Sequence, residues 1–452
     1  MSTKTTPDQH RDEFLQVRSA ETHDQAFPGT WAQQAFWDAM KALGEDDHQF
    51  NLSQSVDIGG DISAAEAFEA VAWMVRRHES FRTLFFEDSE GRVTQQVQGT
   101  VEVPVRVLES DADADQTDAE TEWVSRRFRH VSEIPLRVCL IGLDGGPKRL
   151  VLSISHMCAD LFGIRIAIGE LTDVLGGANP LSFPCPVQPR EVAEFQNSDE
   201  GKTFSDRAVA YWIRTLLDLP AMRVDPGFSD HREPRFWQGQ LSSGSLPRAL
   251  TLLSSRFGVS SSVVLLSAAS LVLGELTGTT RPSLMLMCGN RINAADRRNV
   301  SPRVLEGLFT VNVSCDGFAE LLKRTWRSSL TSYRHSQYNK VDLLSEIQSS
   351  GADRCRLHRT VFYNDARMGG SESPVTAEWP TDEALRPGEC DVRALTDNRG
   401  EEDIALHVHD DGDRLRMTFT ADTELVGPQA IEDSLREIER IILRAVKHCR
   451  RS

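Results

Sequence analysis

Residues 149–161 read Arg149-Leu150-Val151-Leu152-Ser153-Ile154-Ser155-His156-Met157-Cys158-Ala159-Asp160-Leu161. The aliphatic and β-branched run at 149–154 predicts a buried strand. Apolar residues then recur at helical spacing over 161–174, which predicts a helix. His156 therefore lies where a core strand gives way to a helix. Side chains at such junctions often face a cleft, so His156 is a candidate for chemistry.

The spacing His-x-x-x-Asp is by itself a weak signal. His407 with Asp411, and His409 with Asp413, show the same spacing around an Asp-Gly turn. Alternating residues flank that turn, so we interpret it as the solvated tip of a hairpin. The alternative for His156 is a core histidine that is hydrogen-bonded to backbone.

Composition limits the function classes. Hydrophobic residues make up 40% and charged residues 26% of the 452 residues, which predicts a globular chain of two or three domains. A net charge of −17 argues against binding a nucleic-acid backbone. No apolar run reaches membrane-spanning length, and residues 1–7 lack the apolar core of a signal peptide. We therefore expect a cytoplasmic protein, no membrane contact, and a monomer.

The eight cysteines are scattered, without Cys-x-x-Cys spacing. This pattern predicts neither a zinc site nor a disulfide framework, so no metal ligand is assigned. Cys158 lies in the key stretch, between Met157 and Ala159. These neighbours favour a small packed residue over a nucleophile.

Strand and helix signals are mixed in both halves of the chain, which predicts two α/β (α+β) lobes with the substrate between them. We expect a flexible tail at 1–25, an N-terminal lobe at 26–175, a Pro- and Gly-rich linker at 176–190, and a C-terminal lobe at 191–452. Predicted helices cover 31–37, 63–77, 207–217, 246–257, 261–276, 318–333 and 428–448. Predicted strands cover 53–58, 84–86, 94–97, 136–141, 149–154, 283–288 and 361–363, with an apolar segment at 307–313 and a hairpin at 404–420. The acidic stretch 110–120 is interpreted as a loop leading into a helix.

Several motifs, in order, resemble those of one family: the condensation domains of non-ribosomal peptide synthetases, within the chloramphenicol acetyltransferase-like acyltransferases. Residues 31–37 look like the first motif, and 77–85 are close to Arg-His-Glu-x-Leu-Arg-Thr-x-Phe. Residues 155–161 match the signature His-His-x-x-x-Asp-Gly. Residues 307–312 resemble Gly-x-Phe-Val-Asn with the asparagine one residue late, and 335–343 resemble a later motif. Ordered motifs are more specific than any one of them.

The resemblance implies a V-shaped pseudo-dimer of two acyltransferase-like lobes around a central tunnel. It implies that His156 is the catalytic histidine and that Gly307, Phe309 and Asn312 line the tunnel. A carrier protein would deliver an acyl or aminoacyl thioester on its phosphopantetheine arm, and a small-molecule or carrier-bound acceptor would enter from the other side. The chain itself is expected to bind no cofactor, and to be either free-standing or excised from a larger synthetase.

Asp160 stands four residues after His156, at a predicted helix start, where a carboxylate favours the helix dipole and pairs with a cation. Arg291, at the end of the strand at 283–288, is the candidate partner; the alternative is an exposed arginine. Arg82 and Glu79 are predicted to form a structural pair.

Two departures from the signature bear on catalysis. Ser155 replaces its first histidine and Leu161 replaces its glycine. In the family the first histidine is mainly supportive, whereas a leucine is expected to narrow the tunnel or reshape the backbone. The expected function is amide or ester formation from a carrier-bound acyl group. The alternatives are a non-catalytic condensation-like domain that recruits a partner and, more weakly, acyl transfer from coenzyme A.

Overall fold

The computed structural model describes residues 10–21, 25–59, 62–109, 121–143, 146–367, 385–395 and 402–451. Contacts between residues divide the chain into two units. One comprises Met1–Ser205 and Gly289–Leu305, and the other comprises Asp206–Cys288 and Glu306–Ser452. The predicted stretch 110–120 lies outside the described residues.

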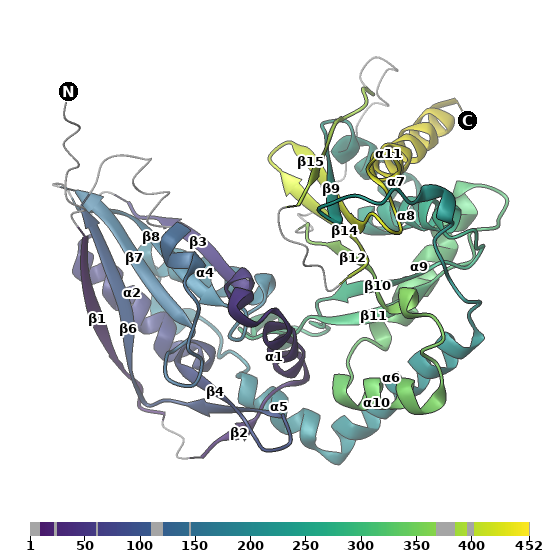
Figure 1. Ribbon diagram of the computed structural model, residues 1–452. Coiled ribbons are helices and arrows are strands. Elements are labelled where there is room, and N and C mark those ends of the chain that lie inside the picture. Colours follow the sequence, from purple (N-terminus) through teal and green to yellow (C-terminus); the bar gives the residue numbers. More distant parts are fainter. Residues whose placement is uncertain are drawn as a thin grey trace. The chain divides into compact units, whose positions relative to one another are not determined.

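The main sheet of the first unit has the strand order β1-β6-β7-β8-β3 (Figure 1). Its strands are β1 (His10–Arg18), β3 (Asn51–Asp57), β6 (Thr100–Glu109), β7 (Leu136–Leu143) and β8 (Gly146–Ser155). All neighbouring pairs are antiparallel except β6 and β7. A smaller sheet has the order β2-β5-β4, formed by Phe27–Pro28, Val93–Val97 and Thr83–Glu87. The predicted strand before His156 is confirmed as β8.

The helices of the first unit include α1 (Trp31–Leu43), α2 (Ala64–Arg77), α4 (Leu161–Leu175) and α5 (Pro189–Asn197). Ser63 caps α2: its side chain accepts a hydrogen bond from Glu66 N, and the Glu66 side chain accepts one from Ser63 N. Apolar faces of α2 and α4 pack with β6, β7 and β8 into one core. This core holds β8 and α4 rigidly on either side of His156.

The expectation of a flexible tail over 1–25 is wrong for His10–Arg18, which forms the edge strand β1 beside β6. Only Val17 of this strand is buried. An edge strand gains main-chain hydrogen bonds from one neighbour and keeps its polar side chains in water. Its composition therefore resembles a loop, and hydrophobic alternation does not reveal it.

The unit boundaries differ from the predicted lobes in two places. Residues 191–205 belong to the first unit, where α5 packs beside β2. Residues 289–305 also belong to the first unit, although they follow a strand of the second. The predicted linker 176–190 lies wholly within the first unit. These assignments depend on contacts between distant segments, which composition does not encode.

The second unit is built on a seven-stranded sheet with the order β11-β10-β12-β14-β15-β9-β13. Its strands are β9 (Phe236–Ser243), β10 (Ser283–Cys288), β11 (Leu305–Thr310), β12 (Val361–Asp365), β13 (Glu389–Ala394), β14 (Ile404–Asp411) and β15 (Arg414–Asp422). β12 runs parallel to β10 and β14, and the strands from β14 to β13 are antiparallel. The predicted hairpin is β14–β15, with Gly412 at its turn in a left-handed conformation.

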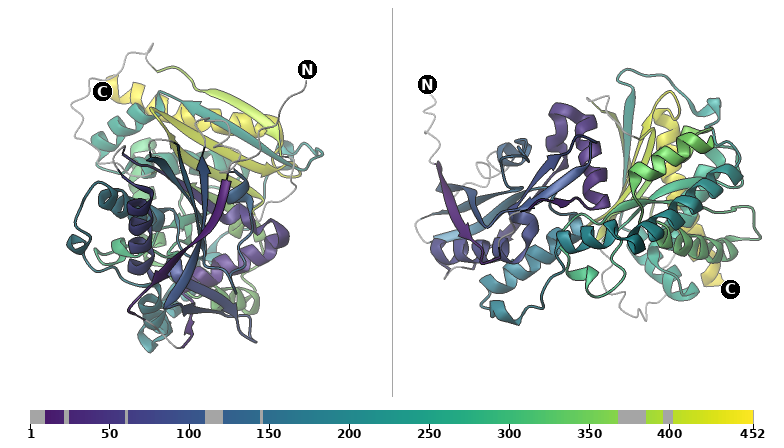
Figure 2. Two further views of the ribbon diagram at one scale, coloured as in Figure 1. Left: turned by 90° about the vertical axis from the view of Figure 1, so that its left-hand side faces the viewer. Right: turned by 90° about the horizontal axis from the view of Figure 1, so that it is seen from below.

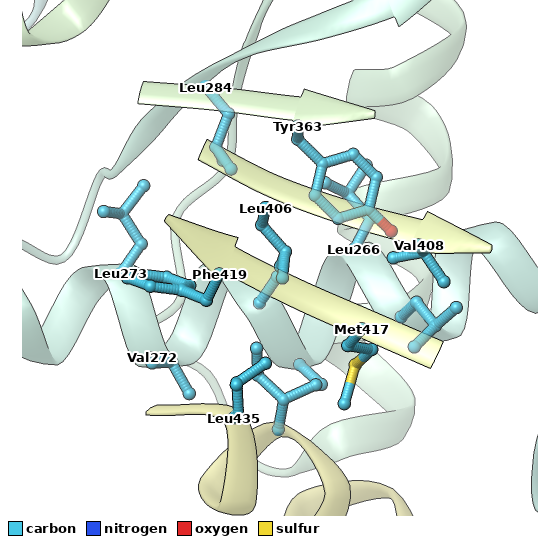
Figure 3. Packing of buried hydrophobic residues seen from close by; sticks show 14 of the residues in the cluster. Leu266, Val272, Leu273, Leu284, Tyr363, Leu406, Val408, Met417, Phe419 and Leu435 are labelled. Carbon is cyan, nitrogen blue, oxygen red and sulfur yellow. The ribbon is translucent and has the colours of Figure 1, made fainter. Parts of the chain in front are cut away.

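The helices of the second unit are α6 (Asp199–Asp218), which spans the boundary, α7 (Leu246–Phe257), α8 (Ser261–Leu276), α9 (Phe318–Arg334), α10 (Lys340–Ser350) and α11 (Pro428–Arg451). α11, yellow in Figure 2, contacts α7, α8, β9, β13 and β15. In Figure 3, side chains such as Leu406 and Phe419 meet Leu273 of α8 in the buried core. α8 is apolar on all sides, as expected for a helix enclosed in a core.

Among the described residues, no single helix is long and apolar enough to cross a membrane. α7 and α8 pass that test only as a pair, bent by 103°.

Candidate active site

His156 lies in a tight turn between β8, which ends at Ser155, and α4, which begins at Leu161. The turn is closed by a 3.0 Å hydrogen bond from Cys158 N to Ser155 O, and His156 N donates to Phe50 O at 3.1 Å. The predicted position of His156 at a strand-to-helix junction is confirmed. These hydrogen bonds fix the main chain on both sides of His156. The orientation of the ring therefore depends on the two side-chain torsions, χ1 and χ2.

The imidazole of His156 is packed between two phenyl rings. It stacks on Phe36 of α1 with a centroid distance of 4.0 Å and an interplanar angle of 21°. Phe50 meets its edge at 6.1 Å. Nδ1 is buried and has no hydrogen-bond partner in the described part of the chain. The alternative of a core histidine whose ring bonds to backbone therefore does not describe this nitrogen.

Burial lowers the pKa of His156 below its usual value of 6.5, and the Asp160 charge and its own backbone carbonyl raise it less strongly. The ring is therefore neutral at pH 7. A neutral imidazole with an unpartnered nitrogen is able to accept a proton or to orient a nucleophile by hydrogen bonding.

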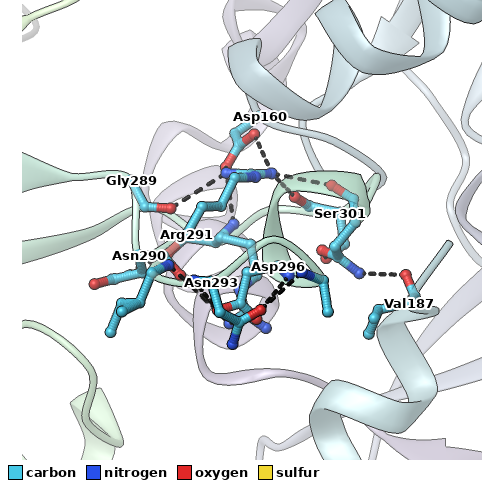
Figure 4. Close-up of polar contacts among 12 residues, drawn as sticks. Asp160, Val187, Gly289, Asn290, Arg291, Asn293, Asp296 and Ser301 are labelled. Carbon is cyan, nitrogen blue, oxygen red and sulfur yellow. Dashed lines mark hydrogen bonds and ion pairs between the residues drawn. The ribbon is translucent and has the colours of Figure 1, made fainter.

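Asp160 is the N-cap of α4, and its carboxylate accepts four hydrogen bonds. Figure 4 shows it beside Arg291. Oδ1 accepts from Gly163 N and from Arg291, both at 2.8 Å. Oδ2 accepts from Arg291 at 2.8 Å and from Arg303 N at 2.9 Å. The predicted Asp160–Arg291 pair is confirmed, and the exposed-arginine alternative is wrong, because the two side chains are 1% and 4% exposed. With four donors bound, the carboxylate is saturated.

The same arginine anchors the segment 289–305 (Figure 4). Arg291 also donates to Gly289 O at 3.2 Å, Asn299 O at 3.3 Å and Ser301 O at 3.0 Å. Asn299 in turn donates to Val187 O at 2.8 Å. A guanidinium has five donors in a fixed plane, so a single side chain is able to organise this whole loop around α4.

The two signature departures are accommodated without strain. Leu161 is the first residue of α4, and Asn290 is the only non-glycine residue with positive φ in the described segments. The backbone at Leu161 therefore needs no glycine. Ser155 is fully buried, and its Oγ bonds to His130 Nε2 at 2.7 Å and to Met157 N at 3.2 Å. Whether Leu161 narrows a passage stays a prediction.

Cys158 has no exposed surface, and burial raises the pKa of its thiol well above the usual value. The interpretation of Cys158 as a packing residue is confirmed. The predicted Glu79–Arg82 pair is also present, at 3.9 Å with both side chains buried. No group of three or more His, Cys, Asp or Glu side chains in the described residues is arranged to hold a metal ion.

The three predicted tunnel residues lie in or after β11, in the second unit. Phe309 is completely buried in the core beside α8, so its assignment to a tunnel wall is wrong. Helices cover both faces of β11, and a local Gly-x-Phe pattern does not distinguish a core phenyl ring from a lining one. Gly307 packs against Cys288 and Ser332, and Asn312 is exposed, with Oδ1 accepting a bond from Ser314 N. Their tunnel role stays a prediction.

The sequence interpretation missed four residues around His156 and Asp160. They are Phe36, Phe50, His130 and Arg303. Phe36 lies within the first motif, which drew attention to its region. The others carry no local signal, because each reaches the site through a contact between distant segments.

The comparisons with known proteins agree with this architecture. The profile of the condensation domain family matches residues 24–452, so the chain belongs to that family. The chain is 26% identical over 329 residues to a probable non-canonical nonribosomal peptide synthetase, CymA, of Salinispora arenicola, covering 69% of this chain and 4% of that protein. It is 25% identical over 328 residues to surfactin synthase subunit 2 of Bacillus subtilis, covering 68% and 9%. The chain spans between 3 and 13% of the length of the curated relatives.

Solved structures show the same fold. The condensation domain of the monacolin K polyketide synthase MokA superposes with a TM-score of 0.72 at 16% identity, covering 94% of this chain and 98% of that one. The structure that describes condensation-domain-mediated chain release from the enacyloxin polyketide synthase gives 0.71 at 18%, covering 94% and 84%. The mixed α/β, chloramphenicol acetyltransferase-like fold expected from the motifs is confirmed.

Proposed function

We propose that this condensation domain joins a carrier-tethered acyl or aminoacyl thioester to an amine or hydroxyl acceptor, with His156 as the catalytic residue. The observation that carries the proposal is the neutral imidazole of His156, with its buried Nδ1 unpartnered, in the turn that resembles the family's signature. Other groups in the turn are unsuitable. Asp160 is saturated by four donors, and Cys158 is a buried thiol.

The proposed step needs no covalent acyl-enzyme. The lone pair of the acceptor amine or hydroxyl attacks the thioester carbonyl. As it does so, His156 accepts the proton of that group or orients the group by hydrogen bonding. The C–S bond breaks, the phosphopantetheine thiol leaves, and the proton held by the imidazole passes to that thiolate. Because a thioester is already activated, positioning contributes much of the rate. The chain itself contributes no cofactor to this reaction, and the carrier protein is the partner.

The proposal is tested by incubating the protein with acyl-loaded carrier protein and a panel of amines and alcohols, followed by mass spectrometry of the products. His156→Ala is expected to reduce product formation about 10²-fold or more. His409→Ala is the matched control, since His409 has the same spacing to an aspartate but lies on the exposed end of β14. Equal rates for His156→Ala and the unaltered protein contradict the proposal.

Two further experiments test the alternative functions, which are acyl transfer from coenzyme A and non-catalytic recruitment of a partner. Acyl-coenzyme A, offered without carrier, tests whether the donor is carrier-bound. A binding assay with loaded carrier protein identifies a recruiting domain, which binds carrier but forms no product from any acceptor.

A further inference from the structure

The hydroxyl of Ser155 links the signature turn to a histidine 25 residues away. His130 Nε2 lies 2.7 Å from Ser155 Oγ. The same Oγ accepts a 3.2 Å hydrogen bond from Met157 N, and Ser155 O accepts one from Cys158 N. His156 is thus enclosed by two hydrogen bonds that both end on Ser155. The position of this serine determines how the turn presents the His156 ring.

The His130 ring forms this hydrogen bond in its neutral state. Burial lowers the pKa of His130 to about 4, while the charges of Asp47 and Glu133 raise it and those of Arg137 and Arg127 lower it. His130 is therefore neutral at pH 7. Ser155 Oγ has one proton and two lone pairs, and the Met157 N–H occupies one of these lone pairs. Either tautomer of the neutral His130 ring therefore forms the bond, with Nε2 as acceptor or as donor.

The backbone around His130 is held by several hydrogen bonds, so the ring is a fixed hydrogen-bond partner for Ser155. Its loop is fastened by the buried Arg137, which donates to Arg126 O and Arg127 O at 2.5 Å and to Glu133 at 2.7 Å. The His130 carbonyl accepts a bond from Phe85 N at 3.0 Å. On one side the ring borders a cavity of about 350 Å³, whose lining includes Trp37, Met40, Lys41 and Asp47.

We propose that His130 is a positioning residue for His156, acting through Ser155. In this chain the imidazole that supports the turn comes from residue 130, whereas the family signature has a histidine at the position of Ser155. The proposal rests on the proposed function of His156, and it assigns to His130 no contact with substrate. The pair acts as one unit, because the His130 ring is hydrogen-bonded to the turn through the Ser155 hydroxyl.

The test is a double-mutant cycle with His130→Leu, Ser155→Ala and the double variant in the acyl-transfer assay. Each single variant is expected to lower kcat about threefold to tenfold with little change in KM, the range for loss of one hydrogen bond. The double variant is expected to lose no more than the worse single one. His358→Leu is the matched control, because His358 is also buried and bonded to a serine, Ser283, but lies in the second unit. It is expected to lower stability and leave kcat unchanged.

A second measurement does not depend on activity. NMR of protein with labelled histidine side chains reports the titration midpoint and tautomer of His156. His130→Leu and Ser155→Ala are expected to shift both equally, and His358→Leu to shift neither. If His130→Leu is poorly folded, His130→Gln, which retains an acceptor, is expected to restore the His156 signals. In His130→Ala, added imidazole has access through the adjoining cavity and is expected to raise kcat.

The outcomes separate the two proposals. If His156→Ala is fully active, the proposed function fails, while the NMR shifts still decide the role of His130. If His156 is required but His130→Leu changes neither kcat nor the His156 signals, the positioning role is overturned. It is also overturned if the losses of the two single variants multiply in the double variant.

Discussion

Arg291 donates two hydrogen bonds of 2.8 Å to Asp160, one to each carboxylate oxygen, although 131 residues separate the two in sequence. The planar guanidinium fits a carboxylate in this two-pronged way, which lysine does not reproduce. The ring of Phe162 lies 4.8 Å from the guanidinium and covers it further. The pair ties the segment 289–305 to the first turn of α4, four residues from His156, so we predict a structural role for it.

Breaking this pair is expected to destabilise the protein. Asp160→Asn or Arg291→Met leaves one charge buried without its partner, which costs about 3–5 kcal/mol. The free energy of unfolding from urea titration measures the loss. The exposed pair Arg92–Glu90 is the control, and Arg92→Met is expected to cost less than about 1 kcal/mol. A soluble Asp160→Asn protein with unchanged stability but weakened substrate binding contradicts the structural role.

The acid limb of the pH–rate profile is expected to lie below pH 6.5. Burial lowers the pKa of His156, so the midpoint of its protonation lies below 6.5. As the pH falls further, protonation removes the acceptor, and kcat/KM declines with it. Measuring kcat/KM from pH 4.5 to 8.5 checks this. An acid limb centred above pH 6.5 is incompatible with His156 as the essential base.

Stability is expected to fall as the pH drops from about 6.5 toward 4. In this window His130 takes up a proton in the unfolded chain, with its usual pKa of 6.5, but not in the folded protein, where the pKa is about 4. The unfolded state binds more protons, so its free energy falls by up to about 1.4 kcal/mol per pH unit for such a histidine.

The comparison of His130→Gln with the unaltered protein isolates this contribution. Urea unfolding at several pH values is expected to show a shallower pH slope for His130→Gln. The exposed His231 is the control, and His231→Gln is expected to keep the original slope. Parallel slopes for all three proteins refute the assignment.

Gly307→Ala is expected to destabilise the second unit. An added Cβ lies 2.6 Å from Ser332 Oγ and 2.8 Å from Cys288 Sγ, so the neighbours must shift, at about 1–3 kcal/mol. Gly169→Ala in α4 is the contrast, because a Cβ there meets no atom within 4 Å and the change favours the helix by about 0.5–1 kcal/mol. Thermal unfolding of the two variants is expected to shift in opposite directions.

Sequence periodicity determined the elements that carry their own burial pattern. α7, α8 and β10 begin and end where the apolar spacing predicts, and β8 with α4 places His156 at its junction. The position of Asp160 at a helix start also predicted an ion pair with a cationic side chain, and Arg291 forms that pair. These features were predictable because one residue and its near neighbours encode them.

Three features depend on tertiary contacts alone: the strand β1, the surroundings of Phe309 and the partner of Ser155. β1 is a strand because β6 offers it a partner, not because of its side chains. Phe309 faces a core rather than a passage because helices cover both faces of β11. Ser155 looks like the loss of a supporting histidine until His130 is seen beside it. Local sequence records which side chains avoid water, whereas the identity of the group that meets each one depends on how distant segments pack.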